Sequence, residues 1–189
     1  MTPSEERSDH ETFMRRTLEL ARKSLMAGEL PIGAIVVAEN AVIAEAYCSD
    51  KRRRMLAHAE LLALITADMK APRIRERIRM TLYTNLEPCV MCLGAAMSFC
   101  VGRIVYGVGA PADGAVTRLA HVSFGNATYA DYRMPTIVGG VMRDESRSLF
   151  QAFIEQSTDD PMVRFAMGVV DADVDERHTM NALSRGSKP

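Results

Sequence analysis

Short runs of β-branched residues alternate with segments of helical periodicity along this 189-residue chain. Three apolar runs are typical of buried strands, at residues 32–38, 81–86 and 103–108. Residues 42–47 predict a return strand after a Glu39-Asn40 hairpin turn, and residues 136–138 predict a short last strand. Helices are expected at residues 9–27, 57–70, 88–100 and 143–156, where apolar side chains recur every three or four positions. Strands that alternate with helices favour an α/β domain, here with one antiparallel pair.

The domain organisation follows from length and composition. A chain of this length is near the usual size of one domain, and the clear strand and helix signals end at residue 156. We therefore expect a single domain over residues 1–156. Residues 157–189 are expected to form a C-terminal extension, with one short helix near residues 161–170 and then a flexible tail.

The balance of charge and hydropathy excludes several classes of protein. With 23 Lys and Arg against 24 Asp and Glu, the net charge of −1 is not that of a polycation that binds nucleic acid by bulk charge. No apolar run approaches the roughly 18 residues that span a bilayer, and the first residues are polar. We expect a cytoplasmic protein with no membrane partner. In that reducing compartment grouped cysteines more often bind metal or do chemistry than form disulfides.

Two short motifs supply side chains that zinc prefers. Cys89 and Cys92 are three positions apart at a predicted helix start, where both thiols lie on one face and the helix dipole favours thiolate. Pro88 suits the first helical position, which needs no amide donor. His58, at the start of another predicted helix, would be a third ligand. Three protein ligands leave one tetrahedral position of zinc open, which is the catalytic pattern, so the sequence predicts one Zn²⁺ per chain.

Glu60 lies two positions beyond His58, and that offset points the two side chains to different sides of a helix. A carboxylate there is poorly placed as a ligand, but it can face the open position and move protons as a general acid and base. A structural zinc site is the alternative hypothesis. Such a site needs a fourth ligand, and the spare cysteines, Cys48 and Cys100, lie in no ligand-like pair.

The His-x-Glu and Pro-Cys-x-x-Cys motifs resemble the signature of zinc-dependent nucleobase deaminases. Residues 11–156 resemble the bacterial tRNA-specific adenosine deaminase branch of the cytidine/deoxycytidylate deaminase superfamily. The stretches that carry this resemblance are residues 31–37, 57–60, 82–92, 94–95, 103–107 and 139–141. The resemblance implies a three-layer α/β/α fold around a five-stranded mixed sheet, usually in a homodimer. The site residues that it implies are His58, Cys89 and Cys92 for zinc, Glu60 for proton transfer, and Ala59, Cys48 and Pro88 at the substrate.

Departures from that branch leave the substrate open. The branch has an Asn after the second strand that reads the base, whereas this chain has Ala46-Tyr47-Cys48-Ser49 there, and residues 109–115 lack the Lys of the branch. Together with the near-neutral charge, these departures favour a free base, nucleoside or nucleotide of adenosine, guanine or cytosine type, deaminated with release of ammonia. Adenosine in tRNA, converted to inosine, is the alternative substrate. A non-catalytic zinc-binding module is the third hypothesis.

A basic run just before the predicted His58 helix bears on that choice. Lys51, Arg52, Arg53 and Arg54 would hold the phosphate of a nucleotide or the backbone of an RNA. A charge run of this kind is also typical of a solvated loop with no ligand.

Overall fold

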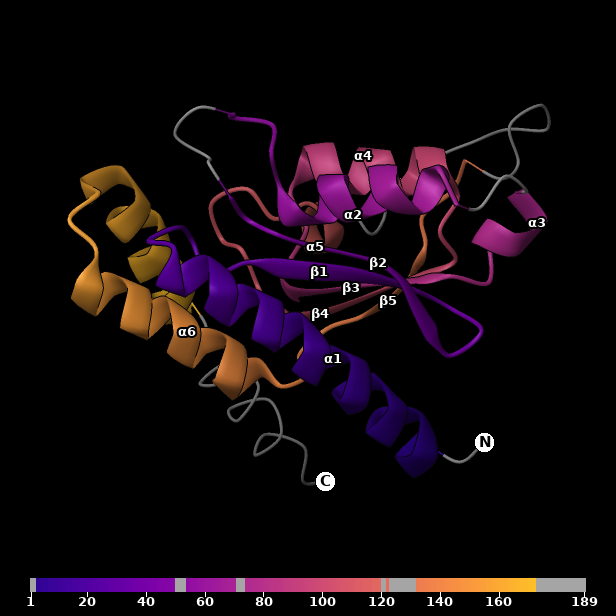
Figure 1. The fold of residues 1–189 in the computed structure, drawn as a ribbon, viewed down its shortest axis with the longest axis horizontal. Coiled ribbons are helices and arrows are strands. Elements are labelled where there is room, and N and C mark those ends of the chain that lie inside the picture. The colour runs from indigo at the N-terminus through magenta and orange to yellow at the C-terminus, as the bar shows by residue number, and fades with distance from the viewer. Residues whose placement is uncertain (1–2, 50–53, 71–73, 120–121, 123–131, 173–189) are drawn as a thin grey trace, which may run out of the picture.

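The computed structural model describes residues 3–49, 54–70, 74–119, 122 and 132–172. They form three layers, with a five-stranded mixed sheet between two layers of helices (Figure 1). Helices α2 (Ala59–Asp68) and α4 (Val90–Phe99) lie side by side over one face of the sheet. Helices α1 (Pro3–Met26) and α6 (Arg143–Gln156) cover the other face. The expected three-layer α/β/α fold is confirmed.

The strands are β1 (Gly33–Ala38), β2 (Ala41–Tyr47), β3 (Thr81–Leu86), β4 (Arg103–Val108) and β5 (Thr136–Val138). They lie in the order β2-β1-β3-β4-β5, with β1 antiparallel to both β2 and β3 and with β3, β4 and β5 parallel. The short helices α3 (Ile74–Arg77) and α5 (Val116–Leu119) follow α2 and β4 in the chain. No helix in the described ranges is long and apolar enough to cross a membrane.

The side chains of the central strands alternate between two apolar clusters, one on each face of the sheet. Ala34 and Val36 of β1 belong to the cluster that includes side chains of α2 and α4. Ile35 and Val37 belong to the cluster formed with α1. Because helices cover both faces, β1 appears in the sequence as a continuous apolar run rather than as an alternating one.

The predicted hairpin turn between β1 and β2 has the backbone that a tight two-residue turn requires. Glu39 and Asn40 both have positive φ, 49° and 61°, as in a type I′ turn. A shift of register between Val36 and Val37 then marks a β-bulge in this pair of strands.

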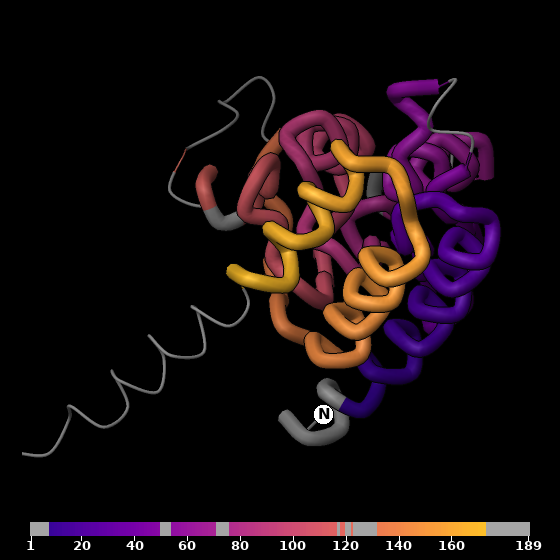
Figure 2. Tube along the Cα trace, turned by 90° about the vertical axis from the view of Figure 1, so that its left-hand side faces the viewer, coloured from indigo at the N-terminus to yellow at the C-terminus, as the bar shows by residue number. Residues whose placement is uncertain are grey.

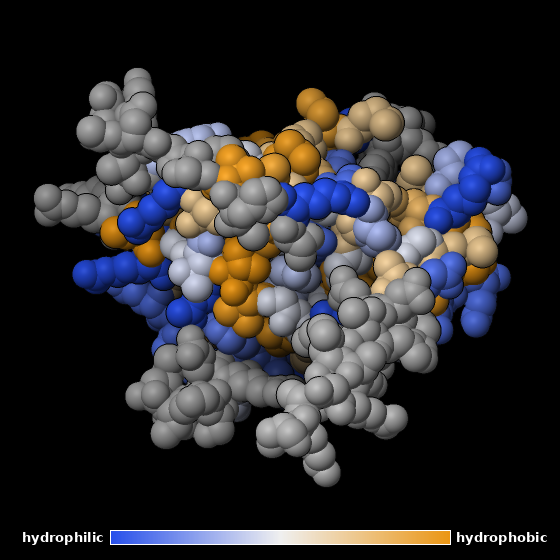
Figure 3. Space-filling model, turned by 180° about the vertical axis from the view of Figure 1, so that it is seen from behind, coloured by the Kyte–Doolittle hydropathy of each residue, from blue (hydrophilic) through white to orange (hydrophobic). Residues whose placement is uncertain are grey.

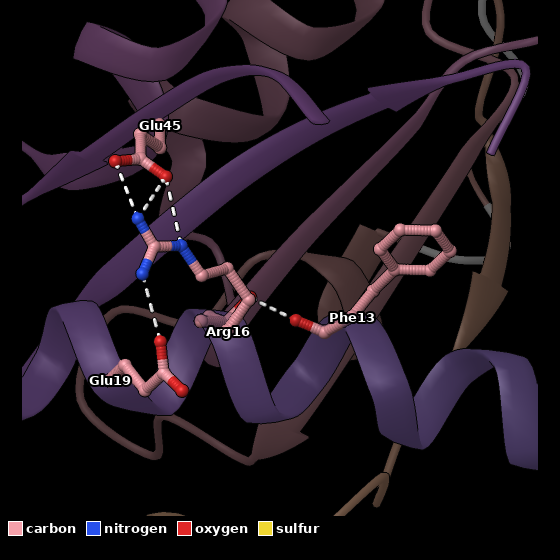
Figure 4. Close-up of polar contacts among 5 residues, drawn as sticks. Phe13, Arg16, Glu19 and Glu45 are labelled. Atoms are coloured by element: carbon pink, nitrogen blue, oxygen red, sulfur yellow. Dashed lines mark hydrogen bonds and ion pairs between the residues drawn. The ribbon is translucent and has the colours of Figure 1, made fainter. Parts of the chain in front are cut away.

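Helix α1 is fixed across the edge strand by a bidentate ion pair. The Arg16 guanidinium donates to the Glu45 carboxylate on β2 at 2.7–3.0 Å and to Glu19, one turn along α1, at 2.8 Å (Figure 4). The two carboxylates raise the pKa of Arg16 above its usual value. Both partners are partly exposed, so this pair orients α1 and contributes at most about 1 kcal/mol to stability.

Two buried polar side chains hold the start of β1 and the end of β2. Asn85, fully buried on β3, donates to the carbonyl of Pro31 at 2.8 Å and accepts the N–H of Gly33 at 2.9 Å. Ser24 of α1 donates to the carbonyl of Cys48 at 2.6 Å. These bonds join the start of β1 and the end of β2 to the rest of the fold.

Two predicted helix starts are wrong by two residues. The helix expected from residue 57 begins at Ala59, and the one expected from Pro88 begins at Val90. His58 and Cys89 keep an extended backbone and stand just outside their helices, so Pro88 is not the first helical residue. Helix α1 begins at Pro3 rather than near residue 9, because the Glu and Arg residues that precede residue 9 are good helix formers.

A further helix covers residues 160–172, as the sequence predicted near residues 161–170. It lies beside α6 (Figure 2), and its Ala166 and Val169 are fully buried in the same cluster as Phe150 and Phe153. The predicted tail, residues 173–189, lies outside the described residues. The division into a domain over 1–156 and an extension over 157–189 stays a prediction.

Candidate metal centre

His58 and Cys89 occupy equivalent positions at the N-terminal ends of α2 and α4. Each is the N-cap, with φ and ψ of −75° and 142° at His58 and of −70° and 172° at Cys89, and neither side chain caps its own helix. The two side chains meet instead, since Sγ of Cys89 lies 3.6 Å from Nδ1 of His58. Two helices from separate parts of the chain therefore direct one ligand each toward a common point.

Cys92, one turn into α4, completes a cluster of three metal-binding side chains. The ligand atoms of His58, Cys89 and Cys92 all lie within 4.8 Å of one another. With Zn–S of about 2.3 Å and Zn–N of about 2.0 Å, a sulfur and a nitrogen of a tetrahedral zinc site lie about 3.5 Å apart. The separation of Sγ of Cys89 from Nδ1 of His58, 3.6 Å, is close to that value. The side chains present thus fit zinc, which they would hold through two sulfurs and one nitrogen.

The cluster has three members rather than four. Among the described residues, this is the one group of three or more His, Cys, Asp or Glu side chains whose ligand atoms could share an ion. Cys48 and Cys100 are outside it. Three protein ligands are the pattern of catalytic zinc sites, because one position is left for a ligand that is not protein.

The two thiols of the cluster are inequivalent before metal binds. The hydrogen bond with Cys92 lowers the pKa of Cys89 to about 4, against the opposing effect of burial, and His58 lowers it further. The same hydrogen bond raises the pKa of Cys92, as do burial and the nearby charge of Glu60. A lowered pKa favours the thiolate form of Cys89, which is the form that binds a metal.

Glu60 lies beside the cluster and not in it. It is the second residue of α2, is 3% exposed, and lies close enough to Cys92 for its charge to act on that thiol. His58 is the N-cap and Glu60 lies in the first turn, so the two side chains leave the chain from different backbone conformations. A buried carboxylate beside a metal centre is suited to accept a proton and to return it.

The three residues predicted to contact the substrate, Ala59, Pro88 and Cys48, are all buried. Ala59 and Pro88 are buried and adjoin the ligands His58 and Cys89 in the chain. Cys48 is buried at the end of β2, where its N–H donates to the carbonyl of Ile32 at 2.9 Å. Contact of these three residues with substrate stays a prediction.

Of the predicted phosphate-binding run, the structure describes one residue. Arg54 is exposed in the segment that precedes α2, and its carbonyl accepts the N–H of Ala57 at 2.9 Å. Lys51, Arg52 and Arg53 lie outside the described residues. Phosphate binding by this run stays a prediction.

A second buried carboxylate, that of Glu87, lies two residues before Cys89 and was not among the predicted site residues. It is 3% exposed, and it accepts the N–H of Ala110 at 3.1 Å. The sequence does contain an indication of it. An acidic residue directly after the apolar run 81–86 must be either exposed to solvent or hydrogen-bonded in the interior.

A protein-family model matches the part of the chain that runs from α1 to β4. The family model of the cytidine and deoxycytidylate deaminase zinc-binding region matches residues 7–108, which include all three residues of the cluster and Glu60. A tRNA-specific adenosine deaminase of Bacillus subtilis is 31% identical over 147 residues, which are 77% of this chain and 89% of that protein. The chloroplastic tRNA(adenine(34)) deaminase of Arabidopsis thaliana is 34% identical over 168 residues, 80% of this chain, but the chain spans only 13% of its length.

Solved structures with two different activities resemble this fold equally well. One comes from a study of A-to-I editing by tRNA:A34 deaminases, with a TM-score of 0.59, 30% identity, and coverage of 73% of this chain and 98% of its own. Another is a guanine deaminase from Nitrosomonas europaea, with a TM-score of 0.59, 26% identity, and coverage of 76% and 83%. Similarity of fold alone therefore does not choose between these substrates.

We predict one zinc ion per chain in protein purified without added metal, measured by elemental analysis. Cys89→Ala and Cys92→Ala should each lose the ion and part of the stability, because metal-binding energy is also folding energy. Cys100→Ala, which removes a half-buried thiol outside the cluster, should retain it. Wild-type protein with far less than one zinc per chain would contradict the assignment.

Proposed function

The chain belongs to the family of cytidine and deoxycytidylate deaminase zinc-binding domains, and we propose that it converts adenosine in a tRNA to inosine. The observation that carries this proposal is the Bacillus subtilis relative, a tRNA-specific adenosine deaminase of which the chain covers 89% at 31% identity. The near-neutral charge and the departures from the motifs of the tRNA branch favour a small-molecule substrate. The relative supports the tRNA substrate more strongly, because its similarity extends over 89% of its length.

The chemistry is a hydrolysis in which water replaces the exocyclic amine of the base and ammonia leaves. Zinc held by His58, Cys89 and Cys92 would supply a Lewis acid that activates the water. The carboxylate of Glu60 accepts a proton from the attacking water and delivers it to a ring nitrogen of the base. It then moves the second proton of the water to the departing amine, so that the carboxylate ends in its initial state.

Backbone donors at the helix ends would orient the base. The first N–H groups of a helix have no acceptor within it, and Ala59 is the first residue of α2. Its N–H, between His58 and Glu60 in the chain, would donate to the base. A base oriented there would present its amine to the cluster, consistent with the predicted contacts of Ala59 and Pro88.

A free purine base is the second candidate substrate. The guanine deaminase neighbour matches the fold as well as the tRNA-editing one does, and the net charge of −1 gives no general attraction for RNA. For either substrate, we propose a cytoplasmic location.

We also propose that the protein is a homodimer through the outer face of α2 and α4. Apolar side chains reach the surface along this upper layer, as Figure 3 shows from behind. Ile65 of α2 is 51% exposed and Val90 of α4 is 64% exposed. A cavity of about 250 Å³ lies between the helices, lined in part by Leu61 and Phe99. An apolar face of this kind is suited to a second copy.

For the chemistry, we expect Glu60→Gln to keep zinc and to lower ammonia release by about 10²–10⁴-fold, because the amide cannot carry a proton. Turnover of a tRNA anticodon stem-loop or a free base measures the rate, and elemental analysis measures the metal. Glu155→Gln, at an exposed carboxylate of α6, is the matched control and should behave as wild type. Full zinc with wild-type turnover in Glu60→Gln would remove the assigned role, and loss of zinc would mean that Glu60 is a ligand.

For the substrate, we expect ammonia release from a tRNA anticodon stem-loop and a steep fall of its affinity with salt. Each phosphate contact adds about 0.7–0.9 to the slope of log affinity against log salt. Arg52→Ala/Arg54→Ala should therefore reduce the slope by about 1.5 without loss of zinc. The control Arg15→Ala/Arg164→Ala removes the same charge from two exposed helix positions and should leave the slope unchanged. Release from free guanine or adenine alone, with a flat salt dependence, would favour the second candidate instead.

For the assembly, we expect a mass near twice 20.8 kDa in analytical ultracentrifugation. Ile65→Glu should shift the protein to monomers without loss of zinc, because the new charge would be buried between copies. The control Val42→Glu makes the same change at a partly exposed position on β2. A monomeric wild-type protein would contradict the dimer.

A further inference from the structure

Glu87 stands at the junction between β3 and the metal ligands of α4. Its backbone N–H donates to the carbonyl of Val108 at 2.8 Å, which continues the pairing of β3 with β4 by one residue. Its side chain is almost fully buried. A buried carboxylate is retained only where its oxygens are hydrogen-bonded, so the partners of this side chain indicate what it holds in place.

One such partner lies in the turn that follows β4. The N–H of Ala110 donates to Oε2 of Glu87 at 3.1 Å. The carbonyl of the same Ala110 accepts the N–H of Gly114 at 2.7 Å, which closes the turn. Gly114 also packs against the carboxylate, since a Cβ there would lie 2.6 Å from Cδ of Glu87. The turn thus packs closely on the Glu87 side chain, and a residue larger than glycine at position 114 would clash with the carboxylate.

The same turn is bonded to the backbone of the metal ligand. Gly114 forms an isolated antiparallel bridge with Cys89, and the N–H of Ala115 donates to the carbonyl of Pro88 at 3.0 Å. The Arg118 guanidinium closes the far side of the turn by donating to the carbonyl of Gly114 at 2.9 Å. Cys89 is therefore held between α4 on one side and this turn on the other.

We infer that Glu87 is a positioning residue that fixes the turn at residues 110–115 against Cys89, and so sets how tightly the cluster retains zinc. Glu87 is not one of the three clustered side chains, and by this inference it does not bind the substrate. It acts through Ala110 and Gly114 on the backbone of one ligand. Removal of such supporting contacts typically weakens metal binding by 10- to 100-fold. The inference depends on the zinc centre and is independent of which base is deaminated.

The test is the rate at which zinc passes from the folded protein to a chromogenic chelator. Glu87→Ala should release zinc about 10–100 times faster than wild type, because the Ala110 N–H loses its acceptor and the turn loosens. Gly114→Ala should do the same, because its new methyl group would clash with both the carboxylate and the carbonyl of Ala110 and would open the turn. Glu87→Gln keeps an oxygen acceptor of the same reach and should release zinc at nearly the wild-type rate.

A control separates positioning from general stability. Leu149→Ala removes a buried side chain of α6 from the cluster on the opposite face of the sheet, so it should lower the urea midpoint of metal-free protein while leaving zinc release unchanged. If Glu87→Ala lowers the midpoint but releases zinc at the wild-type rate, the residue is only structural and the inference fails. Fast release from Glu87→Gln would equally overturn it. Should Glu87→Ala not fold, Gly114→Ala and Glu87→Gln still decide the outcome.

Discussion

The convergence of two helix N-termini on one point beside the sheet is the constraint on which this structure depends. Helix α4 is the crossover between the parallel strands β3 and β4, and α2 packs against β1 and β2 on the same face. Their first residues meet because the antiparallel β1–β3 pair places the two helices next to each other. His58, Cys89 and Cys92 are brought together by this topology, although 34 positions separate the first from the last. The deaminase chemistry follows from that geometry.

Two residues of the metal centre occupy N-cap positions, where other side chains would stabilise the helices. An N-cap Ser, Asp or Asn contributes about 0.5–2 kcal/mol by accepting an N–H of the first turn. Here His58 and Cys89 stand at the N-caps and make no such bond. Both helices therefore lack the stabilising side-chain hydrogen bond at their N-terminal ends. Departures of this kind from local rules occur where function requires them, and zinc binding offsets the loss.

Much of the fold could be predicted from the sequence, because its signals are local. Residues 81–86, 103–108 and 143–156 have the predicted bounds, since each is an uninterrupted apolar or amphipathic segment with clear breaks. The ligands could be identified because few residue types bind zinc at such spacings. The starts of α2 and α4 were misplaced because metal ligands, rather than caps, fill those N-cap positions. The bond from Ala110 to Glu87 could not be predicted, because the turn at residues 110–115 has no periodicity and its contacts are made across the fold.

Zinc K-edge X-ray absorption of the purified protein tests the central claim most directly, because it reports the ligands of the ion rather than the consequences of losing it. The account predicts two sulfur scatterers at about 2.3 Å and a single imidazole nitrogen at about 2.0 Å, with the fourth position filled by a ligand that is not protein. A shell of four protein ligands, with a third sulfur or a second imidazole, would contradict it. Such a closed shell would mean that the cluster is a structural zinc site and that Glu60 faces no open position.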